Sequence, residues 1–230
     1  MTDLFTKLVQ AIVRGETNVV AKMLADDPSL ASVQVSTGAT RQHSSEYFFK
    51  EISHYLYGGD TALHMAAAAF SRSAAQLLVQ YGAACRARNR RGAEPLHYAA
   101  DANRWQPSAQ KEVIEYLLAV GADPNALDQS GVSPLHRAIR TRGSEAVRTL
   151  LAGGARVGLR NGSGSTPLHL AVQDTGKGGA GSARARSEQV KIIAILLEAG
   201  AHVGDKDGKG QSVLDKASNE GIRSLLERAG

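Results

Sequence analysis

Histidine is the residue type whose spacing in this sequence could support chemistry. Four of the seven histidines follow a leucine and precede an alanine by two positions. A metal or catalytic site would require these imidazoles to converge, because metal ligands lie within about 2 Å of the ion. A tandem repeat instead places them in a row, about one repeat apart. We therefore interpret His64, His97, His136 and His169 as structural residues, and His43, His54 and His202 show no ligand spacing.

Residues 176–181 match the pattern G-x-G-x-x-G of dinucleotide-binding loops. The pattern is informative only between a strand and a helix, where backbone amides meet a pyrophosphate and an acidic residue follows about 20 positions later. The sequence offers neither that context nor an acidic residue in a second strand, and Lys177 is not in a Walker arrangement. We expect a flexible basic loop and leave open whether residues 174–187 become ordered on binding.

The only cysteine, Cys85, excludes an intrachain disulfide and a CxxC metal or redox site. A nearly cysteine-free chain is typical of a reducing compartment. Arg86 and Arg88 lie close enough in sequence to lower a thiol pKa, but a small, partly buried side chain is the simpler interpretation. Because HExxH, GxSxG and paired His/Cys motifs are also missing, the sequence predicts no enzyme, no cofactor and no metal.

Length and composition favour a soluble globular protein. The 230 residues are 43% hydrophobic and 21% charged, with a net charge of +5. No segment approaches the ~18 apolar residues that a membrane span requires. The acidic Asp3 and the short apolar stretch at residues 8–13 argue against a signal peptide. We expect a cytoplasmic protein without a membrane partner, and a monomer.

A repeated motif organises the chain. The segments 61–64, 94–97, 133–136 and 166–169 read T-A-L-H, E-P-L-H, S-P-L-H and T-P-L-H, and each leads into a leucine-rich stretch and Gly-Ala. Two weaker copies flank them, around Leu8 and Leu214. The six anchoring leucines are spaced by 55, 33, 39, 33 and 46 residues. A 33-residue unit is therefore interrupted by insertions of 22, 6 and 13 residues.

A 33-residue period that carries T-P-L-H-x-A resembles the ankyrin repeat. The resemblance implies an all-α solenoid of stacked helix-turn-helix units joined by β-hairpin-like loops, forming one domain over residues 1–230. The units are expected at about 4–35, 58–88, 89–127, 128–160, 161–206 and 207–230, with insertions at about 36–57, 104–109 and 174–187.

The motif residues suit the ends of helices. Ser and Thr at the first motif position can accept hydrogen bonds from free backbone amides, and the following proline loses nothing at the first helical position. Glu94 replaces the hydroxyl in one unit, which we expect to weaken that helix start slightly. Gly121 is expected to end a second helix in the left-handed conformation. Asp128 and Asn161 begin turn sequences between units.

The resemblance implies a function as well as a fold. Loop tips and first helices of ankyrin-like stacks form a concave surface that binds proteins, so we expect a non-catalytic interaction scaffold. For each residue the alternative is a merely solvated loop tip. The candidate contact residues are Tyr57, Asp60, Arg90, Arg91, Asp101, Trp105, Gln129, Ser130, Arg140, Thr141 and Gln173.

Charge is concentrated in the middle of the chain. Residues 86–160 hold 12 Lys and Arg and 7 Asp and Glu, which gives the whole net charge of +5. Four arginines, at positions 86, 88, 90 and 91, crowd one loop. An acidic protein surface is the expected partner, because arginine forms planar pairs with carboxylates. The alternative is a nucleic acid or other polyanion, which the seven acids and the lack of a nucleic-acid motif make unlikely.

The first insertion is rich in aromatic residues, namely Tyr47, Phe48, Phe49, Tyr55 and Tyr57. Ser45 is expected to cap a helix over residues 45–56, with Phe48, Ile52 and Tyr55 on one face. That helix either packs over the N-terminal unit or leaves aromatic anchors exposed for a partner. Trp105, in the six-residue insertion, has the same two interpretations, and the sequence does not separate them.

Overall fold

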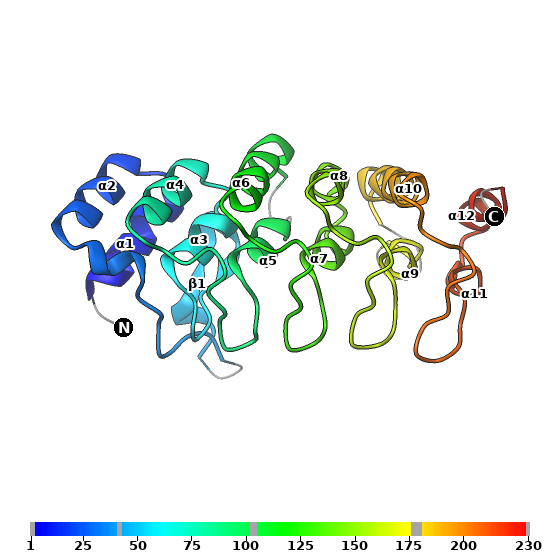
Figure 1. Cartoon of the computed structure of the whole chain (residues 1–230), viewed down its shortest axis with the longest axis horizontal. Coiled ribbons are helices and arrows are strands. Elements are labelled where there is room, and N and C mark those ends of the chain that lie inside the picture. Colours follow the sequence, from blue (N-terminus) through cyan, green and yellow to red (C-terminus); the bar gives the residue numbers. More distant parts are fainter. Residues whose placement is uncertain (1–2, 41–42, 102–104, 176–180, 229–230) are drawn as a thin grey trace.

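The computed structural model describes residues 3–40, 43–101, 105–175 and 181–228. Its helices stand in pairs along one long axis, in two layers (Figure 1). The inner helices are α1 (Asp3–Val13), α3 (Ala62–Ala68), α5 (Pro95–Ala100), α7 (Pro134–Arg140), α9 (Pro167–Ala171) and α11 (Val213–Lys216). The outer helices are α2 (Thr17–Asp26), α4 (Arg72–Gln80), α6 (Pro107–Ala119), α8 (Ser144–Ala152), α10 (Ala183–Glu198) and α12 (Glu220–Glu227).

Each inner helix packs on the next inner helix, and from α2 to α10 the outer helices do the same. Long loops leave the outer layer and turn at the lower edge of the stack before each inner helix (Figure 1). This arrangement confirms the predicted all-α solenoid. None of the helices in the part of the chain that the structure describes is long and apolar enough to cross a membrane.

The inner helices begin as the motif predicts. Thr61, Ser133, Thr166 and Ser212 are N-cap residues, and each makes a reciprocal capping box with the side chain three positions later. Glu94 is also the N-cap of its helix, which begins at Pro95 as the motif predicts, but its buried Oε2 has no hydrogen-bond partner among the described residues. Because these caps satisfy amides that have no partner inside the helix, even short inner helices are well defined.

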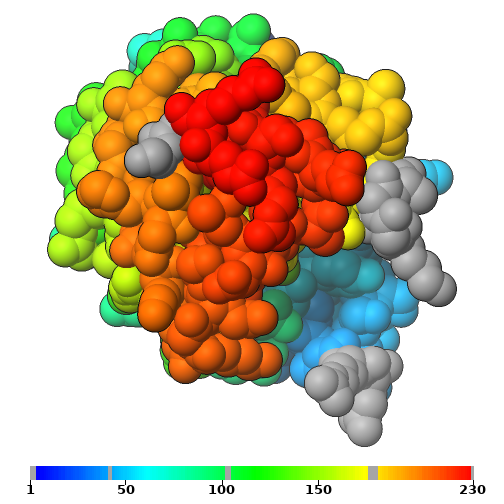
Figure 2. All heavy atoms as spheres, turned by 90° about the vertical axis from the view of Figure 1, so that its right-hand side faces the viewer, coloured from blue at the N-terminus to red at the C-terminus, as the bar shows by residue number. Residues whose placement is uncertain are grey.

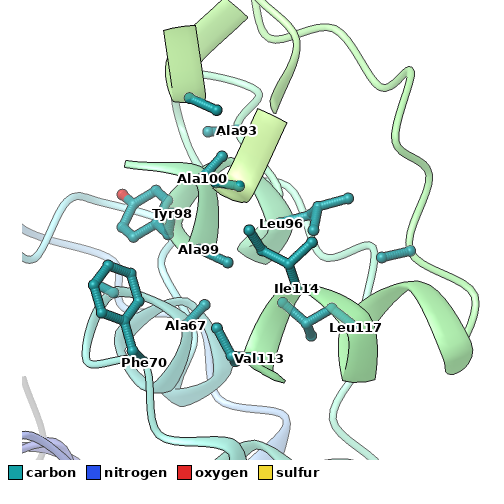
Figure 3. Close-up of a cluster of buried hydrophobic side chains, with 14 of the residues drawn as sticks. Ala67, Phe70, Ala93, Leu96, Tyr98, Ala99, Ala100, Val113, Ile114 and Leu117 are labelled. Atoms are coloured by element: carbon teal, nitrogen blue, oxygen red, sulfur yellow. The ribbon is translucent and has the colours of Figure 1, made fainter. Parts of the chain in front are cut away.

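The core lies between the two layers. The motif leucines Leu63, Leu96 and Leu168 are fully buried and belong to one continuous apolar cluster. In the third unit, Leu96 of α5 points towards Ile114 and Leu117 of α6 (Figure 3). A single helix pair leaves its apolar face open on both sides, so neighbouring units supply the burial that stabilises each one.

The loop tips form a second line of contacts between units. In each of four tips an Asn or Asp side chain accepts hydrogen bonds from amides two and four residues later; these residues are Asn89, Asp128, Asn161 and Asp207. One backbone hydrogen bond then joins each tip to the preceding one. The amides of Arg90, Gln129, Gly162 and Gly208 donate to the carbonyls of Gly58, Arg91, Ser130 and Ser163 over 2.8–3.1 Å.

The first insertion differs from the predicted helix. Residues 45–56 form two short 3₁₀ helices, η2 (Ser45–Tyr47) and η3 (Lys50–Ile52), and an antiparallel pair, β1 (Phe48–Phe49) and β2 (His54–Tyr55). The expected helix is wrong because Ser53 adopts a left-handed conformation, with φ 49°. The turn at Ser53 pairs Phe48 with Tyr55 across two antiparallel strands, whereas the expected helix would have placed them on one helical face, about two turns apart. Viewed from the C-terminal end, the light-blue insertion projects beside the loop tips (Figure 2).

The aromatic residues of the insertion have mixed environments. Ile52 and Leu56 are fully buried and attach the insertion to the core. Phe48 is 41% exposed and lies against Tyr55, with ring centroids 4.8 Å apart. Tyr57 is half-buried. The insertion therefore packs on the core and leaves the Phe48 ring accessible, and a role of its aromatic residues in partner binding stays a prediction.

The other two insertions lengthen outer helices. Pro107 and the residues after it form the first turn of α6, which has 13 residues where α4 and α8 have 9. Helix α10 has 16 residues because Ala183 and the following residues of the third insertion are helical. Part of the segment expected as a loop is thus an extension of α10, and residues 176–180 of the glycine-rich pattern lie outside the described residues.

A substitution at Gly131 tests how closely neighbouring loop tips approach each other. Its φ is +69°, and a Cβ there would lie 2.5 Å from the backbone nitrogen of Gly162. We expect Gly131→Ala to lower the free energy of unfolding by about 2 kcal/mol, through backbone strain and displacement of the next tip. Urea denaturation measures the change. Gly158→Ala is the matched control, because a Cβ at Gly158 meets nothing within 4 Å. Equal effects of the two substitutions would contradict the assignment.

Candidate functional site

The motif histidines link neighbouring units. In unit three, Nδ1 of His97 accepts the amide hydrogen of Glu94 over 3.1 Å, so Nε2 carries the proton and donates to the carbonyl of Val132 over 3.1 Å. His64 and His169 make the same two contacts, with Ala93 and Gln211 as the acceptors in the next unit. The structural interpretation of these histidines is confirmed.

His136 makes the contact within its own unit, but among the described residues its buried Nε2 makes no hydrogen bond of standard geometry to the next unit. Burial lowers the pKa of His64 and His136, and it lowers that of His97 to about 4. The three imidazoles are therefore neutral near pH 7.

A pocket of about 560 Å³ lies on the concave side, between the first insertion and the loops and inner helices of the third and fourth units. Seven of the candidate contact residues line it. They are Tyr57, Arg91, Asp101, Gln129, Ser130, Arg140 and Thr141. The spacing of the repeat therefore brings together residues up to 84 positions apart in sequence.

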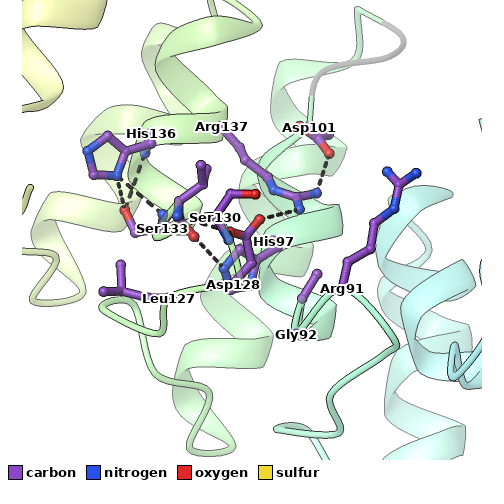
Figure 4. Close-up of polar contacts among 12 residues, drawn as sticks. Arg91, Gly92, His97, Asp101, Leu127, Asp128, Ser130, Ser133, His136 and Arg137 are labelled. Atoms are coloured by element: carbon purple, nitrogen blue, oxygen red, sulfur yellow. Dashed lines mark hydrogen bonds and ion pairs between the residues drawn. The ribbon is translucent and has the colours of Figure 1, made fainter. Parts of the chain in front are cut away.

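An ion-pair triad forms the floor of this pocket. The Arg137 guanidinium donates to Asp101 over 2.9 Å and to Asp128 over 3.1 Å (Figure 4). Burial alone would raise the pKa of Asp128, but the amide of Val132 and the Arg137 guanidinium outweigh it and lower the pKa. Arg137 is 16% exposed. Arg137 thus bridges two carboxylates, and the triad keeps a formal charge of −1.

Arg137 occupies a position that sequence reasoning missed, directly after the motif histidine. In each unit this position lies nine residues after the Asn or Asp of the loop tip. The pairs are Asn89 with Tyr98, Asp128 with Arg137, Asn161 with Leu170, and Asp207 with Lys216. Contacts join the first, second and fourth pairs. An aspartate at the loop tip is paired with a cation nine residues later, and an asparagine with a neutral residue. This correlation in the sequence could have predicted the ion pair of Arg137.

The four clustered arginines lie in one loop but have two different environments. Arg86 forms ion pairs with Glu94 and Asp123, at 3.6 and 3.1 Å. Arg88 donates to the carbonyls of Gly92 and Leu127. Both arginines thus link neighbouring units, and of the two only Arg86 is paired with carboxylates.

Arg91 has no such partner. Its guanidinium lies 4.1 Å from the centroid of the Tyr57 ring, and it points away from the triad (Figure 4). Arg91 and Arg140 are exposed, and neither forms an ion pair within the described parts of the chain. Their charges are therefore open to a ligand in the concave pocket.

Asp60 does not contact solvent, so its expected role in partner binding is wrong. Its carboxylate is fully buried and accepts hydrogen bonds from the Tyr98 hydroxyl and the Asn89 amide, each over 2.8 Å, and from the Tyr57 backbone. Asp60 was a candidate contact residue because a loop-tip residue is usually exposed. Here the aromatic residues of the insertion and of α5 cover it.

Three other candidates lie away from the concave pocket. Arg90 lines an adjoining pocket next to the insertion. Trp105 is 44% exposed and lies beside the outer helices, with the Arg184 guanidinium 4.5 Å from its ring centroid. Gln173 is exposed, and its carbonyl accepts hydrogen bonds from Arg142 and Gln189. The structure does not bring Trp105 or Gln173 to the pocket.

Cys85 is a small, partly buried side chain, as the simpler interpretation of the sequence predicted. It is half-buried, and its thiol donates to the carbonyl of Val120 over 3.3 Å. Burial raises the pKa of this thiol, which lowers its reactivity at neutral pH. Within residues 3–40, 43–101, 105–175 and 181–228, no three His, Cys, Asp or Glu side chains gather to hold a metal ion.

Comparison with known proteins gives one consistent result. The sequence matches the family described as ankyrin repeats (3 copies), over residues 8–128 and again over residues 107–207. It is 30% identical over 135 residues to a putative ankyrin repeat protein of Acanthamoeba polyphaga mimivirus, covering 55% of this chain and 18% of the relative. It is 40% identical over 81 residues to the E3 ubiquitin-protein ligase KEG of Arabidopsis thaliana, covering 35% of this chain and 5% of the ligase.

A third relative, a putative ankyrin repeat protein of fowlpox virus, is 43% identical over 51 residues, which cover 22% of this chain and 8% of the relative. The chain thus spans less than a fifth of the length of each of these curated relatives. The similarity lies in the repeats and does not extend to the remainder of those proteins.

Acid should destabilise the stack through the histidines. The pKa of His97 falls from 6.5 in the unfolded chain to about 4 in the folded protein. Its contribution is therefore complete above pH 6.5 and is lost as the pH falls towards 4, to a total of about 3 kcal/mol. Urea denaturation between pH 7.5 and 4.5 should show this loss. His97→Asn keeps an acceptor for the capping amide but cannot titrate, so its pH dependence should be weaker, and an unchanged profile would refute the assignment.

The pairing of Asp128 with Arg137 can be tested by exchange with another unit. Arg137→Leu leaves the Asp128 and Asp101 carboxylates without a cation, and we expect a loss of about 3 kcal/mol in the free energy of unfolding. Asp128→Asn combined with Arg137→Leu reproduces the Asn161 and Leu170 pair of the next unit. The double variant should recover part of the loss. A double variant less stable than Arg137→Leu alone would show that the contact between positions 128 and 137 does not explain why Asp occurs with a cation and Asn with a neutral residue.

Proposed function

Since this chain belongs to the ankyrin-repeat family, whose repeats generally mediate protein–protein interaction, we propose that it is a non-catalytic scaffold that binds a partner protein on the concave face of its middle units. The observation that carries this proposal is the concave pocket with two exposed arginines, Arg91 and Arg140, that form no ion pair among the described residues. Extended concave surfaces of this kind are the usual binding surfaces of repeat proteins.

The charges of the pocket favour an acidic partner. The lining holds three arginines, Arg91, Arg137 and Arg140, against two aspartates, Asp101 and Asp128, so its net formal charge is +1. Arginine pairs with carboxylates through two parallel hydrogen bonds. Complementary charge across an interface mainly sets the association rate and the choice of partner. Polar side chains such as Gln129 and Ser130 then supply adaptable hydrogen bonds around the rim.

The absence of a catalytic role is also part of the proposal. Three of the four recurring histidines, His64, His97 and His169, make hydrogen bonds between units, and the thiol of Cys85 donates a hydrogen bond to a carbonyl. Arg86 is paired with the carboxylate of Asp123, and Arg88 donates to the carbonyl of Leu127 in the next loop. These contacts between units argue against a nucleic acid as the main ligand. We further propose that the protein acts as a cytoplasmic monomer, in keeping with its single half-buried cysteine.

Charge reversal on the two faces of the stack tests the proposal. The variant Arg91→Glu with Arg140→Glu alters the concave pocket, and Arg72→Glu with Arg148→Glu makes the same change of net charge on the outer helices α4 and α8. We expect the concave variant to bind its partner at least about tenfold more weakly and to melt normally. The outer-face variant should bind like the wild type.

The measurement is affinity capture from nuclease-treated lysate of the native cells, with all three proteins in parallel. A discrete protein retained by the wild type and the outer-face variant, and lost by the concave variant, supports the proposal. A partner retained equally by all three proteins would place the binding site elsewhere. Recovery that disappears with nuclease would favour a nucleic acid.

A further inference from the structure

A second pocket, of about 400 Å³, shares Tyr57 and Arg91 with the concave pocket. It lies between the first insertion and the loop tip of the third unit. Its polar lining consists of Thr40, Ser44, Tyr55, Tyr57, Arg90 and Arg91. These described lining residues carry two guanidinium groups and four hydroxyl groups, and no carboxylate is among them.

The two arginines of this insertion pocket are held in place without being neutralised. Nη2 of Arg90 donates to the carbonyl of Ala39 over 3.3 Å, and Arg91 stacks on Tyr57 at 4.1 Å. A carbonyl and an aromatic ring each restrain a guanidinium but carry no net charge. Arg137 and Arg86 contrast with them, because carboxylates cancel their charges.

The walls of the insertion pocket are fixed by backbone contacts. The amide of Ala39 donates to the carbonyl of Leu56, and the amide of Arg90 donates to the carbonyl of Gly58, both over 2.8 Å. Gly38 lies so close to the backbone of Tyr57 and Gly58 that no side chain fits there. A site whose cations are already oriented loses less conformational entropy when a ligand binds.

We propose that the insertion pocket binds the carboxylate of an aspartate or glutamate side chain of the partner. This inference rests on the proposed function, because the same partner segment would continue past Tyr57 and Arg91 into the concave pocket. The planar forks of Arg90 and Arg91 match a carboxylate, and the hydroxyls of Thr40 and Ser44 offer further donors. The insertion, and not the repeat alone, then selects the partner.

Short peptides test the insertion pocket directly. The probe is a blocked Gly-Ser-Glu-Ser-Gly peptide, titrated into the ¹⁵N-labelled protein, and the matched control carries glutamine in place of glutamate. We expect the glutamate peptide to shift the amide signals of Thr40, Tyr55 and Arg90, and the glutamine peptide to leave them unchanged. Arg90→Gln should weaken this binding at least about tenfold, whereas Arg140→Gln should change it less than about twofold.

Two additions separate the alternatives. Arg90→Lys keeps the charge, so binding within a few-fold of the wild type would support an electrostatic role, and a thermal melt shows whether each variant is folded. A phosphoserine peptide that binds while the glutamate peptide does not would overturn the carboxylate assignment. Equal binding of the glutamate and glutamine peptides would overturn the anion site itself.

The insertion pocket and the proposed function can fail separately. If capture of the partner is insensitive to Arg90→Gln but lost with Arg91→Glu and Arg140→Glu, the concave face binds the partner and the insertion pocket does not. If capture survives the concave variant, the proposed function is wrong whatever the peptides do.

Discussion

The motif histidine is the constraint on which the stack depends. Nδ1 of His97 accepts a hydrogen bond at the start of its own helix, and this fixes the proton on Nε2, which donates to the following unit. One neutral side chain therefore sets both where a helix begins and where the next loop must lie. The inner helices are short, and short helices are marginal alone. Their position comes from this link and from the shared core, so the concave face has a defined shape.

The concave face owes its charge to a difference in how arginines are held. Arg137 is buried between two carboxylates and acts as part of the scaffold. Arg91 is restrained by an aromatic ring, which leaves its charge intact. The first insertion supplies that ring through Tyr57. An irregular segment between regular units thus shapes one wall of this surface.

The sequence was sufficient for features that recur. The caps at Thr61 and Ser133, the left-handed Gly121 and the row of histidines each follow from local rules applied in register. It was insufficient where the answer depends on contacts between distant segments. Residues 45–56 have an apolar spacing that suits a helix or a hairpin, and the left-handed turn at Ser53 sets the hairpin register.

The candidate site was predictable for the same kind of residue, those whose place is set by the repeat. Arg91, Gln129 and Arg140 occupy tip and helix positions that the repeat places on one face. Asp60 occupies an equivalent position but is covered by Tyr98 from the next unit, and the motif does not specify that residue. Loop-tip exposure is therefore a property of a unit together with its neighbour.

The last unit carries Asp215 where the others carry histidine. Its carboxylate turns back to accept from the amide and hydroxyl of Ser212, each over 2.8 Å. An ionised carboxylate only accepts hydrogen bonds, so it has no proton to offer to the backbone carbonyl of a unit stacked beyond it. A unit stacked beyond Asp215 would therefore not receive the hydrogen bond that His64, His97 and His169 donate to a carbonyl of the unit that follows them.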